Sequence, residues 1–99
     1  MKIPKQFTVG KSTYTVIEPY KMERDLVQGR VKYGPRTVEV TQRHFKTGKP
    51  LTTARRAHVF WHEAVHAILK DMGSRKEGDE IFVDGIAKRI IDIIRTAKF

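Results

Sequence analysis

The chain has 99 residues and a mass of 11.5 kDa, contains no cysteine, and carries 20 Lys and Arg against 11 Asp and Glu. This length predicts a single domain over residues 1–99, because chains divide into separate cores only at larger sizes. The absence of cysteine excludes disulfides, thiolate zinc fingers, a cysteine nucleophile and iron–sulfur clusters. Neither an apolar leader nor a run of roughly 20 apolar residues is present, so we expect a cytoplasmic monomer without a membrane partner.

The charge of the chain is unevenly distributed. The formal net charge of +9 belongs entirely to residues 1–60, with 13 basic and four acidic residues, whereas residues 61–99 contain seven of each. The segment from Arg30 to Arg56 has eight basic residues and one acid. Such a segment indicates either a nucleic-acid partner or a solvated face that keeps a small protein soluble. Only Tyr33 and Phe45 supply aromatic groups there, so the sequence leaves both interpretations open.

The first half of the chain predicts β-structure in two hairpins. Residues 7–17 are rich in β-branched and aromatic side chains around a central Gly10-Lys11 turn signal. Residues 30–33 and 37–41 flank a Gly-Pro pair, and apolar and polar residues alternate in the second of them, as in a half-buried strand. Between the two hairpins, residues 21–28 predict a short helical turn.

The second half predicts two helices. Thr52 or Thr53 is a suitable N-cap for a helix over 53–72, which Gly73 ends, and a second helix is predicted over 79–96. At about 100° per residue, the apolar positions of each helix fall on one face, which we expect to form the core. These positions are Ala54, Ala57, Trp61, Val65, Ile68 and Met72 on the first helix, and Val83, Ile86, Ile90, Ile93, Ile94 and Ala97 on the second. The predicted fold is therefore α+β, with a small antiparallel sheet in residues 1–50 followed by an active-site helix and a C-terminal helix.

The run His62-Glu63-Ala64-Val65-His66 is an H-E-x-x-H sequence in the middle of the first predicted helix. Residues four apart project from one face of a helix, so both imidazoles can bind one metal ion. Glu63 lies about 100° round the helix from His62, which places its carboxylate beside the ion as a general base on metal-bound water. The spacing therefore predicts Zn²⁺ held by His62 and His66, with Glu63 catalytic. Two solvated histidines on an exposed helix face are the plainer alternative.

A zinc site of this kind needs a third protein ligand. The extended metzincin pattern would place Gly and His where this chain has Leu69 and Met72, so that pattern is excluded. His44 and His58 are candidates, but three ligands in line on one straight helix cannot surround an ion well, which counts against His58.

The second helix is a better source of the third ligand. Glu80 and Asp84 lie four apart on one face, away from the apolar positions. Glu80 could bind the metal while Asp84 accepts a hydrogen bond from the free N–H of a ligand histidine. Glu77 and Asp79 are the alternatives to Glu80 as the ligand. The plainer interpretation of Asp79 and Glu80 is an acid-rich first turn, which the helix dipole favours.

The residues from Phe60 to Leu69, followed by Glu80-x-x-x-Asp84-x-x-Ala87-x-x-Ile90, resemble the gluzincin class of zinc metallopeptidases. The resemblance is closest to its short ImmA/IrrE-like and phage-encoded members and extends over residues 31–94. It implies a zincin-like minimal core in which Glu80 on the second helix completes the site. The spacing is also similar to that of thermolysin-like enzymes, whose Asp supports a ligand histidine, as Asp84 would here.

The resemblance implies a zinc metallopeptidase that hydrolyses a peptide bond in an intracellular protein, within the host cytoplasm if a phage encodes the chain. An extended substrate would pair with the strand at 37–41, which we expect at the sheet edge beside the active helix. Tyr33, His44 and His58 are the candidates for stabilising the oxyanion. The alternative is a small basic nucleic-acid-binding or host-modulating protein that keeps a metal site without peptidase activity.

Overall fold

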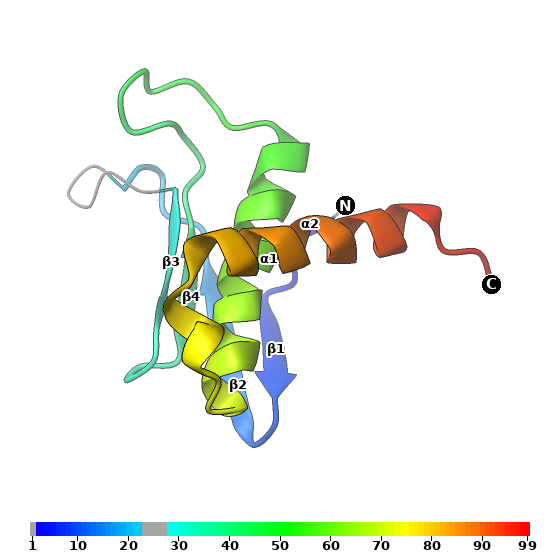
Figure 1. Cartoon of the computed structure of the whole chain (residues 1–99). Coiled ribbons are helices and arrows are strands. Elements are labelled where there is room, and N and C mark those ends of the chain that lie inside the picture. Colours follow the sequence, from blue (N-terminus) through cyan, green and yellow to red (C-terminus); the bar gives the residue numbers. More distant parts are fainter. Residues whose placement is uncertain (1, 23–27) are drawn as a thin grey trace.

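A computed structural model of the chain describes residues 2–22 and 28–99 (Figure 1). The elements in chain order are strands β1 (Gln6–Val9), β2 (Ser12–Ile17), β3 (Gly29–Lys32) and β4 (Thr37–Val40), helix α1 (Thr53–Asp71), the 3₁₀ turn η1 (Arg75–Gly78) and helix α2 (Glu80–Thr96). A four-stranded sheet followed by two helices is the α+β layout predicted from the sequence. The helical turn predicted over 21–28 falls on residues 23–27, which lie outside the described part of the chain.

Both predicted hairpins form, but the sheet that they build is mixed. β1 pairs with β2 and β3 with β4 in antiparallel fashion, whereas β2 and β4 are parallel, with Thr15 opposite Thr37. The turn between β1 and β2 uses the positive φ of Gly10, 58°, which glycine adopts without strain. We expected a wholly antiparallel sheet. Turn signals determine the pairing inside each hairpin and carry no information on how two hairpins join.

The strand order is β1-β2-β4-β3, so β4 lies inside the sheet. The prediction that residues 37–41 form the edge beside the active helix is therefore wrong. The two edge strands are β1 and β3. Within the described residues β3 pairs only with β4, and it lies at the rim of the sheet in Figure 1. Any peptide that extends this sheet near the site must add to β3.

Helix α1 packs on two sides, which explains why a single predicted face describes it incompletely. Towards the sheet, Val59, Phe60, Ala64 and Ala67 are buried against Tyr14, Val38 and Val40. Towards α2, a second cluster joins Val65 and Leu69 to Val83 and Ala87. Ala54 and Met72, which we placed in the core, are exposed because they lie at the two ends of the helix, where neither neighbour reaches.

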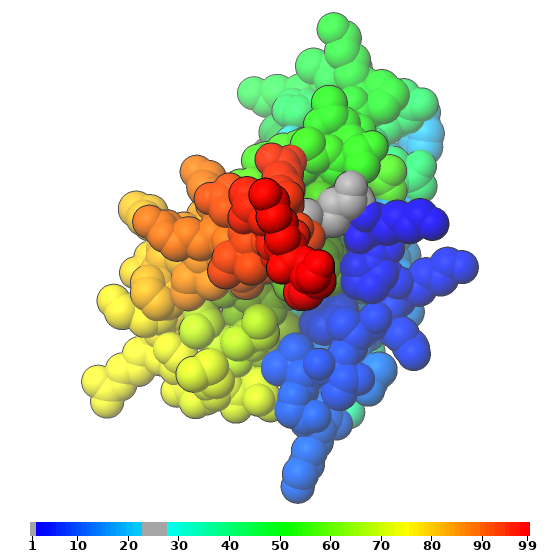
Figure 2. Space-filling model, turned by 90° about the vertical axis from the view of Figure 1, so that its right-hand side faces the viewer, coloured from blue at the N-terminus to red at the C-terminus, as the bar shows by residue number. Residues whose placement is uncertain are grey.

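Helix α2 crosses α1, and its C-terminal half extends past the body of the molecule (Figure 1). Ile93 and Ile94 are 64% and 44% exposed, although their spacing predicted a core face. The crossing is the reason, because the helices diverge after Ile91, which is still buried. In Figure 2 this end of α2, coloured red, stands forward of the green residues that begin α1. No helix in the described ranges is long and apolar enough to cross a bilayer.

Candidate metal centre

Helix α1 brings His62, Glu63 and His66 together. Each of the three offers a potential ligand atom, and these atoms lie within 4.8 Å of one another. The first histidine is half-buried, whereas Glu63 and His66 are 9% and 7% exposed. The grouping predicted from the H-E-x-x-H spacing is therefore present as a cluster that could hold a metal ion. Solvated histidines on an exposed helix face, the plainer alternative, do not describe it.

Glu80, at the start of α2, faces the two imidazoles. Its Oε2 lies 2.7 Å from Nε2 of His62, and its Oε1 lies 3.0 Å from Nε2 of His66. One carboxylate thus meets the same ring nitrogen of both histidines. This is where we expected the third ligand from the second helix.

The other ring nitrogen of each histidine is held from outside the cluster. Nδ1 of His62 lies 3.1 Å from Oδ1 of Asp84, the residue predicted for this supporting position. Nδ1 of His66 lies 2.7 Å from the backbone carbonyl oxygen of Glu77. When the imidazoles are neutral and each Nδ1 donates to its oxygen, the unprotonated Nε2 atoms face Glu80, and a protonated imidazole can also donate from Nε2 to the Glu80 carboxylate. The carbonyl of Glu77 had no signal in the sequence, because every residue has one.

The alternatives to Glu80 are engaged elsewhere. The carboxylate of Glu77 accepts a hydrogen bond of 2.6 Å from the hydroxyl of Tyr33 and lies 3.3 Å from Nδ1 of His66, not from its Nε2. The carboxylate of Asp79 caps α2 by accepting from the backbone N–H of Phe82 at 3.0 Å. Both residues therefore stabilise the surroundings of the cluster.

The remaining histidines occupy different places. His44 lies in the loop after β4, where its Nδ1 accepts from the backbone N–H of Lys46 at 3.1 Å, and it does not join the cluster. Nε2 of His58 lies 2.7 Å from Oδ1 of Asp84, the same oxygen that meets His62. His58 is therefore linked to the cluster through Asp84, and Tyr33 is bound to Glu77. Of the three oxyanion candidates, only His58 lines the cleft described next.

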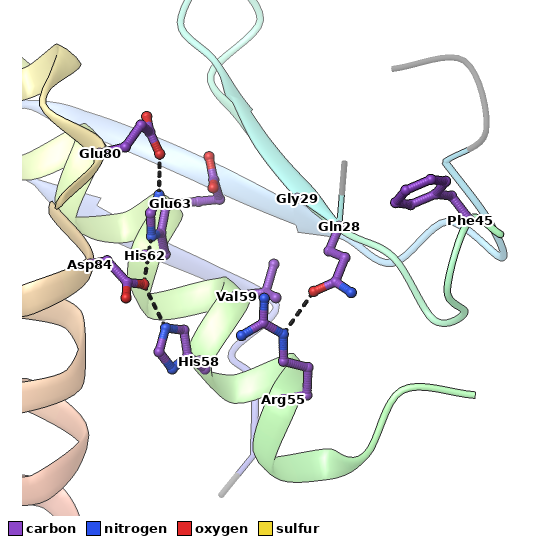
Figure 3. A pocket seen from close by; sticks show the side chains of 10 residues that line it. All are labelled: Gln28, Gly29, Phe45, Arg55, His58, Val59, His62, Glu63, Glu80 and Asp84. Atoms are coloured by element: carbon purple, nitrogen blue, oxygen red, sulfur yellow. Dashed lines mark hydrogen bonds and ion pairs between the residues drawn. The ribbon is translucent and has the colours of Figure 1, made fainter. Parts of the chain in front are cut away.

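A cleft of about 360 Å³ opens between α1, the start of α2 and the edge strand β3 (Figure 3). Glu63 and Gly29 lie next to each other in its lining. A Cβ atom built on Gly29 would lie 3.3 Å from Cγ of Glu63 and 2.4 Å from a methyl carbon of Val59, so only glycine lets β3 approach the helix this closely. The cleft residues that sequence reasoning missed are Gln28, Gly29, Phe45, Arg55 and Val59.

The surroundings shift the pKa values of the site. Burial raises the pKa of Glu63 above its usual range. Burial lowers the pKa of His62, but hydrogen bonds with Asp84 and Glu80 outweigh that effect and raise it. The hydrogen bond with His58 is the main cause that holds the pKa of Asp84 well below its ordinary value. Asp84 is therefore an ionised acceptor for His62, and Glu63 is a carboxylate with unusually high proton affinity.

The chain matches no protein-family model, no curated protein and no solved structure, so the site must be judged on its own donor atoms. Two imidazole nitrogens and a carboxylate are the donors typical of a catalytic zinc site, which keeps one position for water or substrate. Supporting oxygens on both Nδ1 atoms are the usual companions of such ligands. The residues present therefore fit a zinc ion.

Proposed function

We propose that this chain is a zinc-dependent metallopeptidase in which His62, His66 and Glu80 hold the ion. One observation carries the proposal. The carboxylate of Glu80 spans the Nε2 atoms of both histidines, and the buried Glu63 lies beside them at a cleft bordered by an edge strand. When bound, zinc would polarise the scissile carbonyl and lower the pKa of a water molecule towards roughly 7.

Residues of the chain would supply the other two functions, substrate binding and proton transfer. The edge of β3 would bind an extended peptide through main-chain hydrogen bonds, which brings the scissile bond past Gly29 to the cluster. Glu63 would take a proton from the attacking water on a carboxylate oxygen and pass it to the leaving amide nitrogen. Its raised pKa suits both transfers, because a general base works best when its pKa approaches the working pH.

Metal content is the first test of the proposal. We expect one Zn²⁺ per chain in the wild type and none in the double variant His62→Ala/His66→Ala, measured by elemental analysis after removal of loosely bound metal. His44→Ala is the matched control, because His44 lies outside the cluster, and it should keep the zinc. A wild-type protein that takes up no zinc would refute the proposal.

Cleavage is the second test. We expect the zinc-loaded chain to cut peptides in a mixed library read by mass spectrometry. Glu63→Gln should keep the metal and abolish the cutting, since the amide cannot accept the proton. Cleavage that survives in Glu63→Gln would exclude Glu63 as the base, even if the metal is present.

The nucleic-acid alternative stays a prediction. Ion pairs within the basic segment reduce the number of cations that could contact phosphate. Arg30 and Lys32 bind Glu39, and Arg56 binds Glu18. These cations serve the fold, so fewer are left for phosphate than the composition indicates. A titration with duplex DNA at several salt concentrations counts the phosphate contacts that remain. The logarithm of the binding constant should fall with the logarithm of the salt concentration at a slope of roughly −0.9 per contact.

A further inference from the structure

A second hollow lies where the two helices diverge. It measures about 480 Å³ and is formed by the first two turns of α1 and the C-terminal half of α2. Arg55 and His58 line both this hollow and the cleft that holds Glu63. The cleft and the second hollow therefore adjoin at these two side chains, at the end of the cleft away from Glu80, where Figure 3 shows Arg55, and we call the two together the groove.

Cations dominate the second hollow. Arg55, Lys88 and Arg95 line it, against the single acid Asp92. Lys88 lies 3.3 Å from the carboxylate of Asp84, whereas Arg55 and Arg95 form no ion pair with an acid in the part of the chain that the structure describes. The floor between them includes the apolar Ile91, so the hollow combines two uncompensated positive charges with an apolar surface.

Arg55 is not placed there for the stability of its helix. It occupies the first turn of α1, which contains no acidic residue, and a cation at that end opposes the helix dipole. The neighbouring Arg56 is compensated by Glu18, but Arg55 donates from Nε to the neutral Oε1 of Gln28 at 2.7 Å. This hydrogen bond holds the guanidinium where the cleft and the second hollow meet (Figure 3), and its neutral partner does not cancel the positive charge.

We propose that the groove binds an acidic peptide segment and that Arg55 is the residue that selects it. The inference rests on the proposed function, since the segment would be the part of the substrate that leaves the cluster towards α2. The planar guanidinium of Arg55 suits a carboxylate that enters from the cleft, and Arg95 would meet a second acid further along.

A peptide suits this groove better than a nucleic acid. A phosphate backbone needs a continuous cationic surface, whereas here the lining also contains two acids, Asp84 in the cleft and Asp92 in the second hollow. Separate carboxylates on an otherwise apolar peptide can place their charges against Arg55 and Arg95 and avoid those acids. The position of the cleft beside β3 also favours an extended chain.

The test measures binding, so that it does not depend on cleavage. The probes are a fluorescently labelled 12-residue peptide of alternating Glu and Ala, its Gln–Ala counterpart, and a labelled 20-base-pair DNA duplex, each titrated by anisotropy with the full chain carrying Glu63→Gln. We expect the Glu peptide to bind more tightly than the Gln peptide. Arg55→Glu should weaken that binding about 10-fold or more, the loss typical of a charge-assisted hydrogen bond.

Arg89→Glu is the matched control. It makes the same change in net charge at another exposed arginine, which donates to the backbone of Gly85 and lines neither hollow. We expect it to weaken binding by less than about 2-fold, as surface charges outside a contact do. Arg55→Gln is a second variant in case charge reversal disturbs α1, and it should also lose the preference for Glu over Gln.

Three outcomes would overturn the inference. Equal losses in Arg55→Glu and Arg89→Glu would mean that the overall charge attracts the peptide. Equal binding of the Glu and Gln peptides would remove the role of the carboxylates, and DNA that displaces the Glu peptide in an Arg55-dependent way would assign the groove to phosphate. Repeating the titration without zinc separates the two proposals, because Arg55-dependent binding in a chain that never takes up zinc would refute the metallopeptidase and retain the groove.

Discussion

The two histidines of the candidate metal centre are one helical turn apart, but they are held from different regions by different groups. On the α2 side, His62 meets the carboxylate of Asp84 at 3.1 Å. On the η1 side, His66 meets the backbone carbonyl of Glu77 at 2.7 Å. A single substitution can remove a carboxylate but not a carbonyl. On the α2 side, a substitution that removes the contact should therefore weaken zinc binding directly. On the η1 side, zinc binding should weaken only when the groups that hold η1 in place are lost.

The wider contacts of the two sides differ in the same way. Asp84 is a centre of side-chain contacts, since it also meets His58 at 2.7 Å and Lys88 at 3.3 Å. The η1 side is tied to the sheet instead, because the hydroxyl of Tyr33, just after β3, donates to Glu77 at 2.6 Å and lies 3.3 Å from the carbonyl of His66. One side depends on packing between helices and the other on packing of η1 against a hairpin.

Removal of Glu80 should have the largest effect on the α2 side. Glu80→Ala takes away a carboxylate that meets both Nε2 atoms, so we expect zinc affinity to fall by more than the roughly 100-fold that loss of a supporting group causes. Competition with a chelator of known affinity measures it. Asp92→Ala, an exposed acid on the same helix, should bind zinc like the wild type. An unchanged affinity in Glu80→Ala would exclude Glu80 as a ligand of the ion.

Asp84 should rank second. Asp84→Asn keeps an oxygen near Nδ1 of His62 but loses the charge, and we expect zinc affinity to fall about 10- to 100-fold. The same competition assay applies, with Lys88→Met as its control. That lysine touches the other carboxylate oxygen of Asp84, so its loss should leave the affinity within a factor of about 2. If Asp84→Asn and Lys88→Met lose the same zinc affinity, that affinity depends on the charge balance of α2 and not on the contact with His62.

The part of the site that lies within one helix could be predicted from the sequence. Helical periodicity places His62, Glu63 and His66 relative to one another whatever else the chain does, and it likewise places Asp84 one turn after Glu80. The elements themselves were also predictable, because β-branched runs, a Gly10 turn and a Thr52 cap are local signals.

The part that depends on how elements meet could not be predicted. The parallel pairing of β2 with β4 decides that β3 is an edge strand, and so that Gly29 borders Glu63. The support of His66 comes from a backbone carbonyl, which has no residue type to mark it. The second hollow beside Arg55 exists only because α2 diverges from α1, and no local pattern predicts that divergence.

Tyr33→Phe tests the η1 side and should have a smaller effect. Loss of the hydroxyl leaves the carboxylate of Glu77 without its 2.6 Å donor, which we expect to cost about 0.5–1.5 kcal/mol of unfolding free energy. Zinc affinity should fall less than in Asp84→Asn, because the carbonyl that meets His66 remains. Urea unfolding and the chelator assay measure the two. Tyr20→Phe is the control, at a tyrosine that is 63% exposed, and it should change neither the unfolding free energy nor the zinc affinity. If Tyr33→Phe lost as much zinc affinity as Asp84→Asn, the distinction between the two sides would be contradicted.

Glu39 gives the smallest effect and tests how far the η1 side depends on its hairpin. Burial alone would raise the pKa of Glu39, but hydrogen bonds from Arg30 at 2.6 Å and Lys32 at 3.3 Å across the β3–β4 pair outweigh it and lower the pKa. A carboxyl whose pKa is lower in the folded chain than in the unfolded one stabilises the fold above its unfolded pKa, which is near 4.5. That contribution is lost as the pH falls through the folded pKa.

Glu39→Gln should therefore reduce the free energy of unfolding at pH 7, and the difference from the wild type should shrink to nothing in acid. Arg30 and Lys32 are 38% and 44% exposed, so solvent screening limits the effect to about 1 kcal/mol or less. Urea titrations of both proteins without zinc, at pH 7 and well below 4.5, measure it, and subtraction removes the titration of the shared site carboxylates. If the difference in unfolding free energy grew on acidification, folding would raise the pKa of Glu39 and not lower it. A large loss of zinc affinity at pH 7 would show that the β3–β4 pair, through Tyr33, controls the η1 side more strongly than the contacts of Glu77 indicate.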